Sequence, residues 1–526
     1  MTRYLLQGGI VLSLDPEVGD FDRADVLVED DRILAIGPDL AAEAEVVDCT
    51  GLVVMPGFIQ THRHQYETVM RAVNSDGLLF GSWPQESYFS VVQEIWTAGR
   101  VGDPANPVWD LGRPPLDPED VYLAELVASL GLIAQGVTMT ADTSQSSHSA
   151  EYTDAMIQGL QDAGQRALFV YSPGVDRGGY EFPGRVGDPT GGIGRIAERH
   201  FTSKDQLVTL GAGMYPWDGS GDHTGWQLAR AYDAHITNHN VGMGDVVVHT
   251  AADPRNGEDW SDVTLVHCTS WQDHPVAQIG CHGHGMPERS TSRAMDIFAD
   301  RGGHISISPL IEAQMGHGSP PLQLALNHGI LPSLSGDVDT NMTSEPFSLM
   351  RAAYMLQRGL ANDLRLPRSN PGDLTPPQLL TARQVLEMAT IAGAAGNGVL
   401  DRTGTLTPGK QADIVFLDTR NLDIAPACNI PGAVVTLMNQ HHVRHVMIAG
   451  RFRHREGQLV DVDIASLVAR IEDAQERALA RINGPAVVGA LPRGNNSESG
   501  PYRPNRFGST SYVGQNTDAP AYRLRP

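Results

Sequence analysis

The segment Pro56-Gly57-Phe58-Ile59-Gln60-Thr61-His62-Arg63-His64 ends a short apolar run with two histidines, two positions apart. Residues two apart on a β-strand point to the same face, so His62 and His64 could reach one metal ion. A His-x-His pair alone is a weak signal, because two ordinary surface or core histidines would give the same pattern. The segment therefore predicts a strand with a candidate metal site at its C-terminal end.

Eight short apolar runs, separated by helical stretches, follow the pattern of βα units in a parallel sheet. In the helical stretches 118–135 and 150–163, apolar residues recur at intervals of three and four. Eight parallel strands close naturally into a barrel, so we predict an α/β fold of the (β/α)8 TIM barrel class. The predicted strands are 54–61, 137–142, 167–172, 207–214, 234–239, 264–268, 304–308 and 331–337.

The two ends of the chain follow a different pattern. Short β-rich runs with turns occupy the first 55 residues, and similar runs return after residue 404. We expect a small composite β-sandwich from 1–58 and 405–460, beside a barrel of 59–404. An amphipathic helix is expected at 461–482. The Gly-, Pro-, Asn-, Ser- and Arg-rich stretch 483–526 predicts an extended or disordered tail.

The composition is that of a globular protein. With 526 residues, 41% hydrophobic and 19% charged, the chain can form a large core. It contains neither an apolar run long enough to span a bilayer nor a secretory signal, so we expect a cytoplasmic location. A formal net charge of −24 disfavours nucleic acid and anionic membranes as partners. Its four cysteines lack CxxC spacing, which favours free thiols over a thiolate zinc site.

Three further polar residues, His239, His267 and Asp337, lie at the ends of later predicted strands, where barrel enzymes place their chemistry. Three imidazoles and a carboxylate suit a borderline divalent ion such as zinc or iron, with a position left for water. Two alternatives stay open. His249 also ends an apolar run and competes with His239, and Asp339 faces the same way as Asp337 on a strand.

In these residues the sequence resembles the amidohydrolase superfamily, in the branch of cytosine deaminase, guanine deaminase and the triazine chlorohydrolases. The resemblance covers roughly residues 1–460, including Pro408-Gly409-Lys410-Gln411-Ala412-Asp413, and is strongest to uncharacterised members around 306–318 and 332–335. It implies a barrel with a split sandwich, a small-molecule substrate and a homodimer or larger homo-oligomer.

The resemblance also implies roles for the residues at the strand ends. The strand-six position, His267, orients the water or the substrate in single-metal members. No lysine ends the predicted strand 207–214, so a bridging carboxylated lysine has no obvious source. We therefore predict one divalent ion, with zinc favoured over iron or manganese. The implied metal ligands are His62, His64, His239 and Asp337.

These roles predict a metal-dependent hydrolase. A bound ion would lower the pKa of water, Asp337 would move the proton, and His267 would stabilise the developing negative charge. We expect hydrolysis of a C–N bond in an N-heterocycle, by a deaminase-like or amidase-like reaction. A hydrolytic dehalogenase, or a lyase or decarboxylase, is the alternative within the enzyme class. A binding protein that has lost its chemistry is the alternative outside it.

Two features depart from the deaminase pattern. Classical deaminases of this branch have a proton-shuttling glutamate where this chain has Gly242. Glu312 and His317, in the seventh predicted βα loop, are the predicted substitutes and substrate-binding groups, although a loop carboxylate often only caps a helix.

The second departure is an insert at 271–290, about twice the length expected between His267 and the next strand. It could form a lid, and its Cys281-His282-Gly283-His284 motif could trap adventitious metal. Trp83 and Trp96, after the first barrel strand, are predicted pocket-lining residues, although aromatic side chains more often pack in a core.

Overall fold

The computed structural model describes most of the chain but leaves several predicted features out. The insert residues 271–289, the tail from Asn483, Trp83, Trp96 and Gly242 lie outside the described residues. The described residues are 2–75, 77–79, 88, 101–103, 106–110, 116–172, 184–187, 190–216, 224–241, 244–269, 290–365 and 379–482.

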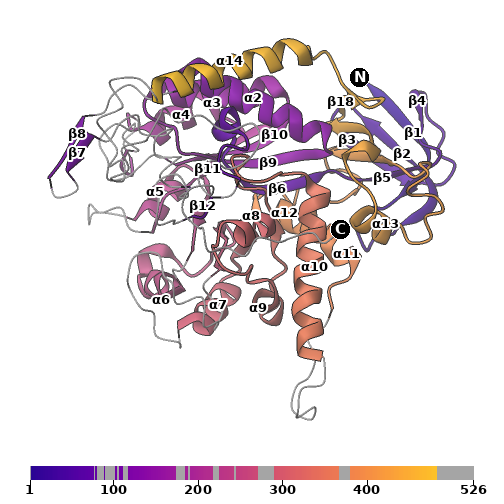
Figure 1. Cartoon of the computed structure of the whole chain (residues 1–526). Helices are drawn as coiled ribbons and strands as arrows, with labels where there is room; N and C mark the ends of the chain where they lie inside the picture. Colours follow the sequence, from indigo (N-terminus) through magenta and orange to yellow (C-terminus); the bar gives the residue numbers. More distant parts are fainter. Residues whose placement is uncertain are drawn as a thin grey trace, which may run out of the picture.

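Eight parallel strands form the central sheet (Figure 1), and each corresponds to one predicted strand. A parallel bridge between Arg63 and Asp337 joins its two edges, so the sheet closes into a barrel. The strands in sheet order are β15 (Ser333–Leu334), β14 (His304–Ile307), β13 (Val263–Val266), β12 (His235–His239), β11 (Val208–Ala212), β10 (Arg166–Tyr171), β9 (Val137–Ser144) and β6 (Phe58–Arg63).

The prediction of one continuous strand at 54–61 was wrong. The run is divided between β5 (Leu52–Pro56), which belongs to a second sheet, and β6, which belongs to the barrel. Gly57 separates them, and a Cβ atom there would lie 2.1 Å from Cγ2 of Thr138. An unbroken apolar run does not reveal this change of sheet, because both strands are buried throughout.

Helices cover the outside of the barrel, and α14 lies across α2 in Figure 1. Asp117 and Asp120 form a capping box that starts α2, with Pro118 at its first turn. The α-helices are α2 (Pro118–Ala134), α3 (Ala150–Ala163), α4 (Gly192–His200), α5 (Gly225–Ala231), α6 (Gly244–Ala252), α7 (Ser290–Asp300), α8 (Pro309–Gln314), α9 (Leu322–Asn327), α10 (Pro346–Arg365), α11 (Ala382–Met388), α12 (Ile391–Gly396), α13 (Ile430–Thr436) and α14 (Ile464–Ile482). The 3-10 helices are η1 (Gln65–Met70), η2 (Pro254–Asn256) and η4 (Gln440–His442).

The second sheet combines strands from both ends of the chain, which meet where β5 pairs antiparallel with β16. This arrangement and the closed barrel confirm the predicted fold class; the exact domain boundaries stay a prediction. The strands of the second sheet, in order, are β19 (Gln458–Leu459), β18 (Arg451–Arg455), β17 (Val443–Ile448), β16 (Ile414–Asp418), β5, β1 (Arg3–Val11), β2 (Phe21–Glu29) and β3 (Arg32–Gly37), with β4 (Glu45–Asp48) beside β1. A separate hairpin pairs β7 (Val101–Asp103) with β8 (Asn106–Asp110).

A buried ion pair joins the barrel to the second sheet. Nε and Nη2 of Arg166, in β10, donate to the two carboxylate oxygens of Asp413 at 2.6 and 3.1 Å. Both side chains are almost completely buried. Asp413 also accepts a hydrogen bond from the backbone of Ala449, so one carboxylate holds together three parts of the fold.

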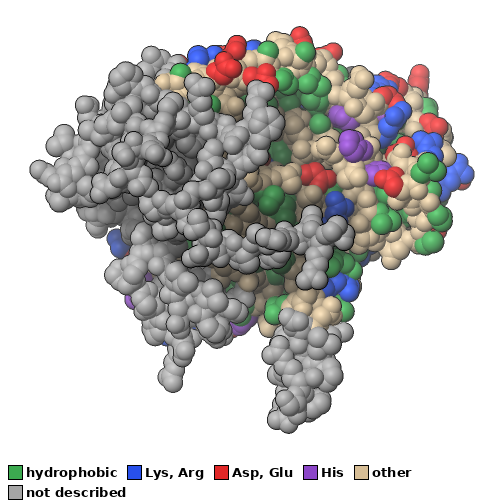
Figure 2. Space-filling model, in the orientation of Figure 1, with side chains coloured by type: hydrophobic (Ala, Val, Ile, Leu, Met, Phe, Trp, Pro, Cys, Tyr) green, Lys and Arg blue, Asp and Glu red, His purple; other side chains and the backbone are tan. Residues whose placement is uncertain are grey.

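The described part of the surface that faces the viewer in Figure 2 is mixed in character. In the view of Figure 2, acidic, basic and hydrophobic side chains are interspersed. Among the residues that the structure describes, no helix is both long and apolar enough to cross a membrane.

Candidate metal centre

Four predicted ligands converge near the seam of the barrel, where its first and last strands meet. Nε2 of His64 lies 3.1 Å from Nε2 of His239, and Nε2 of His62 lies 3.1 Å from Oδ1 of Asp337. The ligand atoms of these four residues all lie within 4.8 Å of one another. His62 lies in β6, His64 directly follows it, His239 ends β12, and Asp337 follows β15. Three imidazole nitrogens and one carboxylate oxygen in this arrangement suit a divalent ion such as zinc.

Thr143, at the end of β9, orients the two histidines of the first barrel strand. Its carbonyl oxygen accepts a hydrogen bond from Nδ1 of His64 at 3.2 Å. Because a carbonyl only accepts, Nδ1 carries the proton and the lone pair of Nε2 faces the centre. The hydroxyl of Thr143 lies 3.0 Å from Nδ1 of His62. Thr143 was not among the residues predicted from the sequence, although its position near the end of a barrel strand could have indicated it.

Burial sets the protonation states of these groups. It lowers the pKa of His62 and His239 and, with the charge of neighbouring His62, lowers the pKa of His64 to about 3. Burial opposes ionisation of Asp337, but the hydrogen bond with His62 and the nearby histidines hold its pKa well below the usual value. Neutral imidazoles and an ionised carboxylate are the forms that bind a metal ion.

His267 and Glu312 form a buried pair beside the four ligands. Nδ1 of His267 lies 3.0 Å from Oε1 of Glu312, and its Nε2 lies 3.6 Å from Oδ2 of Asp337. Burial opposes protonation of His267, but the hydrogen bond with Glu312 and the charges of Asp337 and Glu312 outweigh it, so the pKa of His267 is raised. Burial also raises the pKa of Glu312, against the opposing effect of His267. The pair therefore retains a proton.

His267 and Asp337 share an unusual backbone conformation. Their φ angles are +73° and +57°, in the left-handed region that non-glycine residues rarely adopt. Such a conformation costs about 1–3 kcal/mol and persists only where surrounding contacts impose it. For His267 the backbone N donates to the carbonyl of Ser306 at 2.8 Å. The two residues nearest the expected chemistry are thus held by strand pairing in strained positions.

His317 lies against His267, with ring centroids 4.8 Å apart and nearly perpendicular planes. Both ring nitrogens of His317 are buried, and neither has a hydrogen-bond partner among the described residues. Burial, followed by the neighbouring charge of His267, lowers the pKa of His317 to about 3. The structure therefore brings both residues predicted in the seventh loop, Glu312 and His317, against His267.

The two alternative ligands lie elsewhere. His249 is exposed on α6, away from the four converging ligands. Asp339 forms ion pairs with Nη2 of Arg63 at 3.0 Å and with Nε of Arg71 at 3.1 Å. These pairs, with burial opposing them, lower the pKa of Asp339 to about 2. Asp339 therefore neutralises the charges of Arg63 and Arg71 instead of joining the four converging ligands.

Glu67 is a buried acid that the sequence analysis missed. It lies on η1, three residues after His64, and accepts hydrogen bonds from the hydroxyls of Tyr88 (2.6 Å), Tyr66 (3.2 Å) and Thr340 (3.3 Å). Burial raises the pKa of the Glu67 carboxyl to about 8, despite these hydrogen bonds. A protonated carboxyl group is thus present close to the metal centre at neutral pH.

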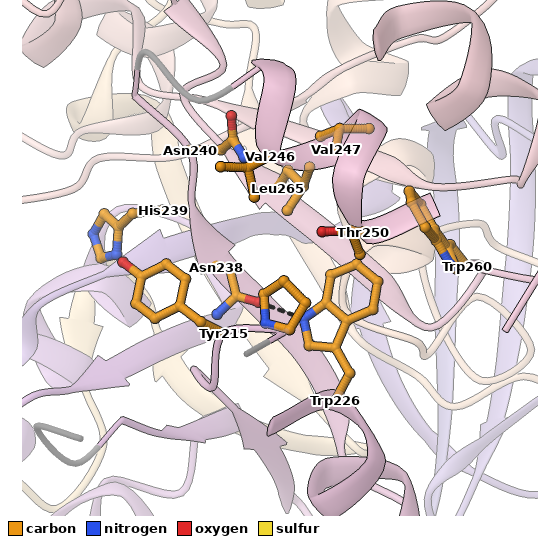
Figure 3. Close-up of a pocket in the computed structure, with 11 residues that line it drawn as sticks. Tyr215, Trp226, Asn238, His239, Asn240, Val246, Val247, Thr250, Trp260 and Leu265 are labelled. Atoms are coloured by element: carbon orange, nitrogen blue, oxygen red, sulfur yellow. Dashed lines mark hydrogen bonds between the residues drawn. The ribbon is translucent and has the colours of Figure 1, made fainter. Parts of the chain in front are cut away.

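A pocket lies beside His239 (Figure 3). The hydroxyl of Tyr215, which follows β11, points toward the ring of His239. The indole of Trp226 donates to Oδ1 of Asn238 at 2.9 Å, and the Nδ2 of Asn238 has no partner among the described residues. The remaining lining residues are Pro216, Asn240, Val246, Val247, Thr250, Trp260 and Leu265. This pocket was not predicted from the sequence, because it forms only where α5, α6 and the segment after β11 pack against β12.

A model of the amidohydrolase family matches residues 132–454. Among curated relatives, the 5'-deoxyadenosine deaminase of Methanosarcina mazei is 25% identical over 498 residues, which cover 92% of this chain and 100% of that protein. The 5-methylthioadenosine/S-adenosylhomocysteine deaminase of Syntrophobacter fumaroxidans is 25% identical over 486 residues, covering 89% of this chain and 96% of that protein.

Solved structures share the fold. An adenosine deaminase from Xanthomonas campestris with bound zinc superposes with a TM-score of 0.68 at 20% identity, covering 91% of this chain and 98% of that chain. Atrazine chlorohydrolase from Arthrobacter aurescens TC1, complexed with zinc, gives 0.69 at 20% identity and covers 90% and 100%. The family match extends over more than half of the sequence and confirms the resemblance found there. The chain belongs to the amidohydrolase family.

Proposed function

We propose that this chain is a metal-dependent hydrolase that releases an amine or ammonia from an amino-substituted N-heterocycle. The observation that carries the proposal is the convergence of four ligand atoms within 4.8 Å, next to the His267–Glu312 pair. The curated deaminase relatives support the C–N bond and the heterocycle. Zinc in the solved neighbours supports zinc, with iron and manganese as alternatives. One ion is proposed, held by His62, His64, His239 and Asp337.

The residues of the chain divide the proton transfers between them. A divalent ion, when bound, supplies Lewis-acid chemistry and lowers the pKa of water. Oδ2 of Asp337 faces His267 rather than the other ligands, so it can accept the proton of the attacking water and pass it to the leaving nitrogen. His267, kept protonated by Glu312, stabilises the negative charge that develops on the substrate.

The acid that serves the ring nitrogen must come from a residue other than Gly242. Glu312 and His317 are the proposed substitutes, because both lie against His267 and each keeps a buried atom without a hydrogen-bond partner among the described residues. Because the pKa of His317 is lowered to about 3, its neutral ring would donate a hydrogen bond to the ring nitrogen, and Glu312 would be the source of the proton. Glu67 is a third source of a proton near neutral pH. Proton transfer to the ring would then come from loop seven or η1 rather than from the residues after β12.

The pocket beside His239 is largely filled by its own side chains, because Trp226 packs edge-to-face against Trp260 and donates to Asn238. Tyr215, whose hydroxyl points toward the ring of His239, is the substrate contact proposed there. Trp83 and Trp96 remain predicted lining residues, and a homodimer or larger assembly in the cytoplasm remains the predicted state.

The proposal is tested by metal analysis combined with a substrate screen. Protein purified without chelator is assayed for ammonia release from adenosine derivatives and other aminated heterocycles, before and after metal removal. Activity that disappears with the metal and returns with zinc is expected, and His62→Ala should not recover it. Full turnover by the metal-free protein would refute the proposal.

A second candidate function is hydrolytic dehalogenation, or a lyase or decarboxylase reaction, on the same centre. It is favoured only by Gly242, which removes the usual deaminase acid. Release of halide from halogenated heterocycles, or of carbon dioxide from acids, separates these reactions from deamination. A non-catalytic binding protein would bind a heterocycle without releasing any product.

A further inference from the structure

A second cluster of possible ligands adjoins the four described above. One ring nitrogen each of His267 and His317 and a carboxylate oxygen of Asp337 lie within 4.8 Å of one another. The cluster shares only Asp337 with the first group. Oδ1 of Asp337 lies 3.1 Å from Nε2 of His62, whereas Oδ2 lies 3.6 Å from Nε2 of His267. The two oxygens of one carboxylate thus face two different groups of imidazoles.

His317 gives an independent indication of a ligand. Nearly all buried polar atoms in proteins have a hydrogen-bond partner, yet both ring nitrogens of His317 are buried and have none among the described residues. The backbone holds this residue in place, because Gly316 and Gly318 have φ angles of +73° and +108° and the N of His317 donates to the carbonyl of Glu312 at 3.1 Å. Glycines at these positions allow a turn that brings the ring against His267.

We propose that His267, His317 and Oδ2 of Asp337 form a second, weaker site for a divalent cation, and that zinc bound there inhibits the enzyme. The inference rests on the proposed function, because it takes the first site to be the catalytic one. Two imidazoles and a carboxylate, with water completing the coordination, match the ligands that zinc prefers.

Charge explains why the second site is the weaker one. A single carboxylate, Asp337, would be shared between two dications, and Glu312, the acid beside this cluster among the described residues, acts through His267. Repulsion between the ions in this buried setting therefore lowers the affinity for the second.

Inhibition follows from the same contacts. A cation at the second site would displace the proton from Nε2 of His267, while Nδ1 keeps its proton toward Glu312, and would also bind Oδ2 of Asp337. These are the groups proposed to stabilise charge and to move the proton.

The test is a zinc titration of the full chain, first loaded to one equivalent. Zinc per chain is measured by elemental analysis after equilibrium dialysis at fixed free zinc, and the rate is followed in parallel. Wild-type protein should bind a second equivalent as its rate falls. In His317→Gln, the dissociation constant for the second equivalent should rise at least about tenfold, with the first equivalent retained.

Two control variants exclude other zinc traps. His249→Gln removes an exposed histidine on α6, and the double variant His282→Gln/His284→Gln removes the motif of the insert. Both should behave as wild type in the second binding step. If the insert variant alone abolishes that step, or if His317→Gln titrates like wild type, the proposal is overturned.

A spectroscopic measurement on the unaltered protein covers the case in which His317→Gln fails to fold. Cobalt-substituted wild type with two equivalents should show magnetic coupling in electron paramagnetic resonance, because the two ions share Asp337. Two uncoupled ions, or a single equivalent at saturation, would overturn the second site alone. Absence of a tight first equivalent would instead refute the proposed function.

Discussion

Asp337 contacts His62 through both its backbone and its side chain. The backbone N of Asp337 donates to the carbonyl oxygen of His62 at 3.2 Å, while Oδ1 lies 3.1 Å from Nε2 of the histidine. The first contact closes the barrel between its last and first strands, and the second belongs to the candidate metal centre. The backbone contact that closes the barrel therefore also places Asp337 beside His62. Because this contact is made by the backbone, the position of Asp337 does not depend on the charge of its side chain.

Replacement of Asp337 by Asn should separate position from charge. We expect an intact fold, weaker metal binding and a fall in kcat of at least about a hundredfold, because general acid–base catalysis contributes this much. Circular dichroism, metal content and steady-state kinetics measure the three effects. Asp339→Asn is the matched control, because it removes the charge that pairs with Arg63 and Arg71. It should lower the melting temperature but reduce kcat much less than Asp337→Asn does. Near wild-type turnover in Asp337→Asn would contradict the assigned role.

Glu312→Gln should change the pH profile. Glu312 raises the pKa of His267, so its removal lowers that pKa and His267 loses its proton at lower pH. If the protonated imidazole stabilises the developing charge, the alkaline limb of kcat/KM moves toward lower pH. A uniform loss of activity with an unchanged profile would show that Glu312 has only a structural role.

The parts of the site that were predicted are those fixed by strand periodicity. His62 and His64 share a face because residues two apart on a strand must do so, and His239, His267 and Asp337 were sought where barrel strands end. The structure brings all five together, and their metal-binding and catalytic roles stay a prediction.

The parts that were missed depend on tertiary packing. Gly57 divides one apolar run between two sheets because of its contact with Thr138, a partner 81 positions away, and no local pattern encodes that. Glu67 looks like an ordinary surface acid in the sequence, and contacts with residues distant in the sequence, such as Tyr88 and Thr340, help to bury it.

Glu67→Gln should alter the pH dependence of stability. In the folded chain the Glu67 carboxyl keeps its proton up to about pH 8, whereas in the unfolded chain it ionises above about pH 4.5. The unfolded state thus binds fewer protons in this interval, so wild-type stability falls as pH rises, by about 1.4 kcal/mol per pH unit from this group. The variant lacks this slope. Its free energy of unfolding, measured in urea, should therefore rise relative to that of wild type between pH 5 and 8. Parallel stability curves would contradict a protonated Glu67.

Metal removal should destabilise the protein, and acid should destabilise the metal-free chain further. The pKa of His64 is lowered from 6.5 to about 3, so below pH 6.5 the unfolded state takes up a proton that the folded state does not. Stability of the metal-free chain therefore falls as pH falls from 6.5, whereas zinc at a hundred times its dissociation constant adds about 2.7 kcal/mol. Thermal unfolding at pH 7.5 and 5.5, with chelator and with zinc, measures both effects. His64→Gln should lose the zinc response, and a zinc response kept in that variant would place the ion elsewhere.

Asp413→Asn should destabilise the whole fold without altering the chemistry. The aspartate ends the Pro408–Asp413 motif, and its partner Arg166 is 1% exposed, so the substitution leaves a buried guanidinium without its counter-charge. Breaking a buried pair in this way costs about 3–5 kcal/mol. Glu45→Gln is the matched control, since it breaks the exposed pair with Arg455 and should cost at most about 1 kcal/mol. Denaturant unfolding of both variants gives the comparison, with metal content and kcat of the folded fraction expected to match wild type. Equal losses in the two variants would mean that the barrel and the second sheet are joined by the surrounding apolar core, and that Asp413 is not what holds them together.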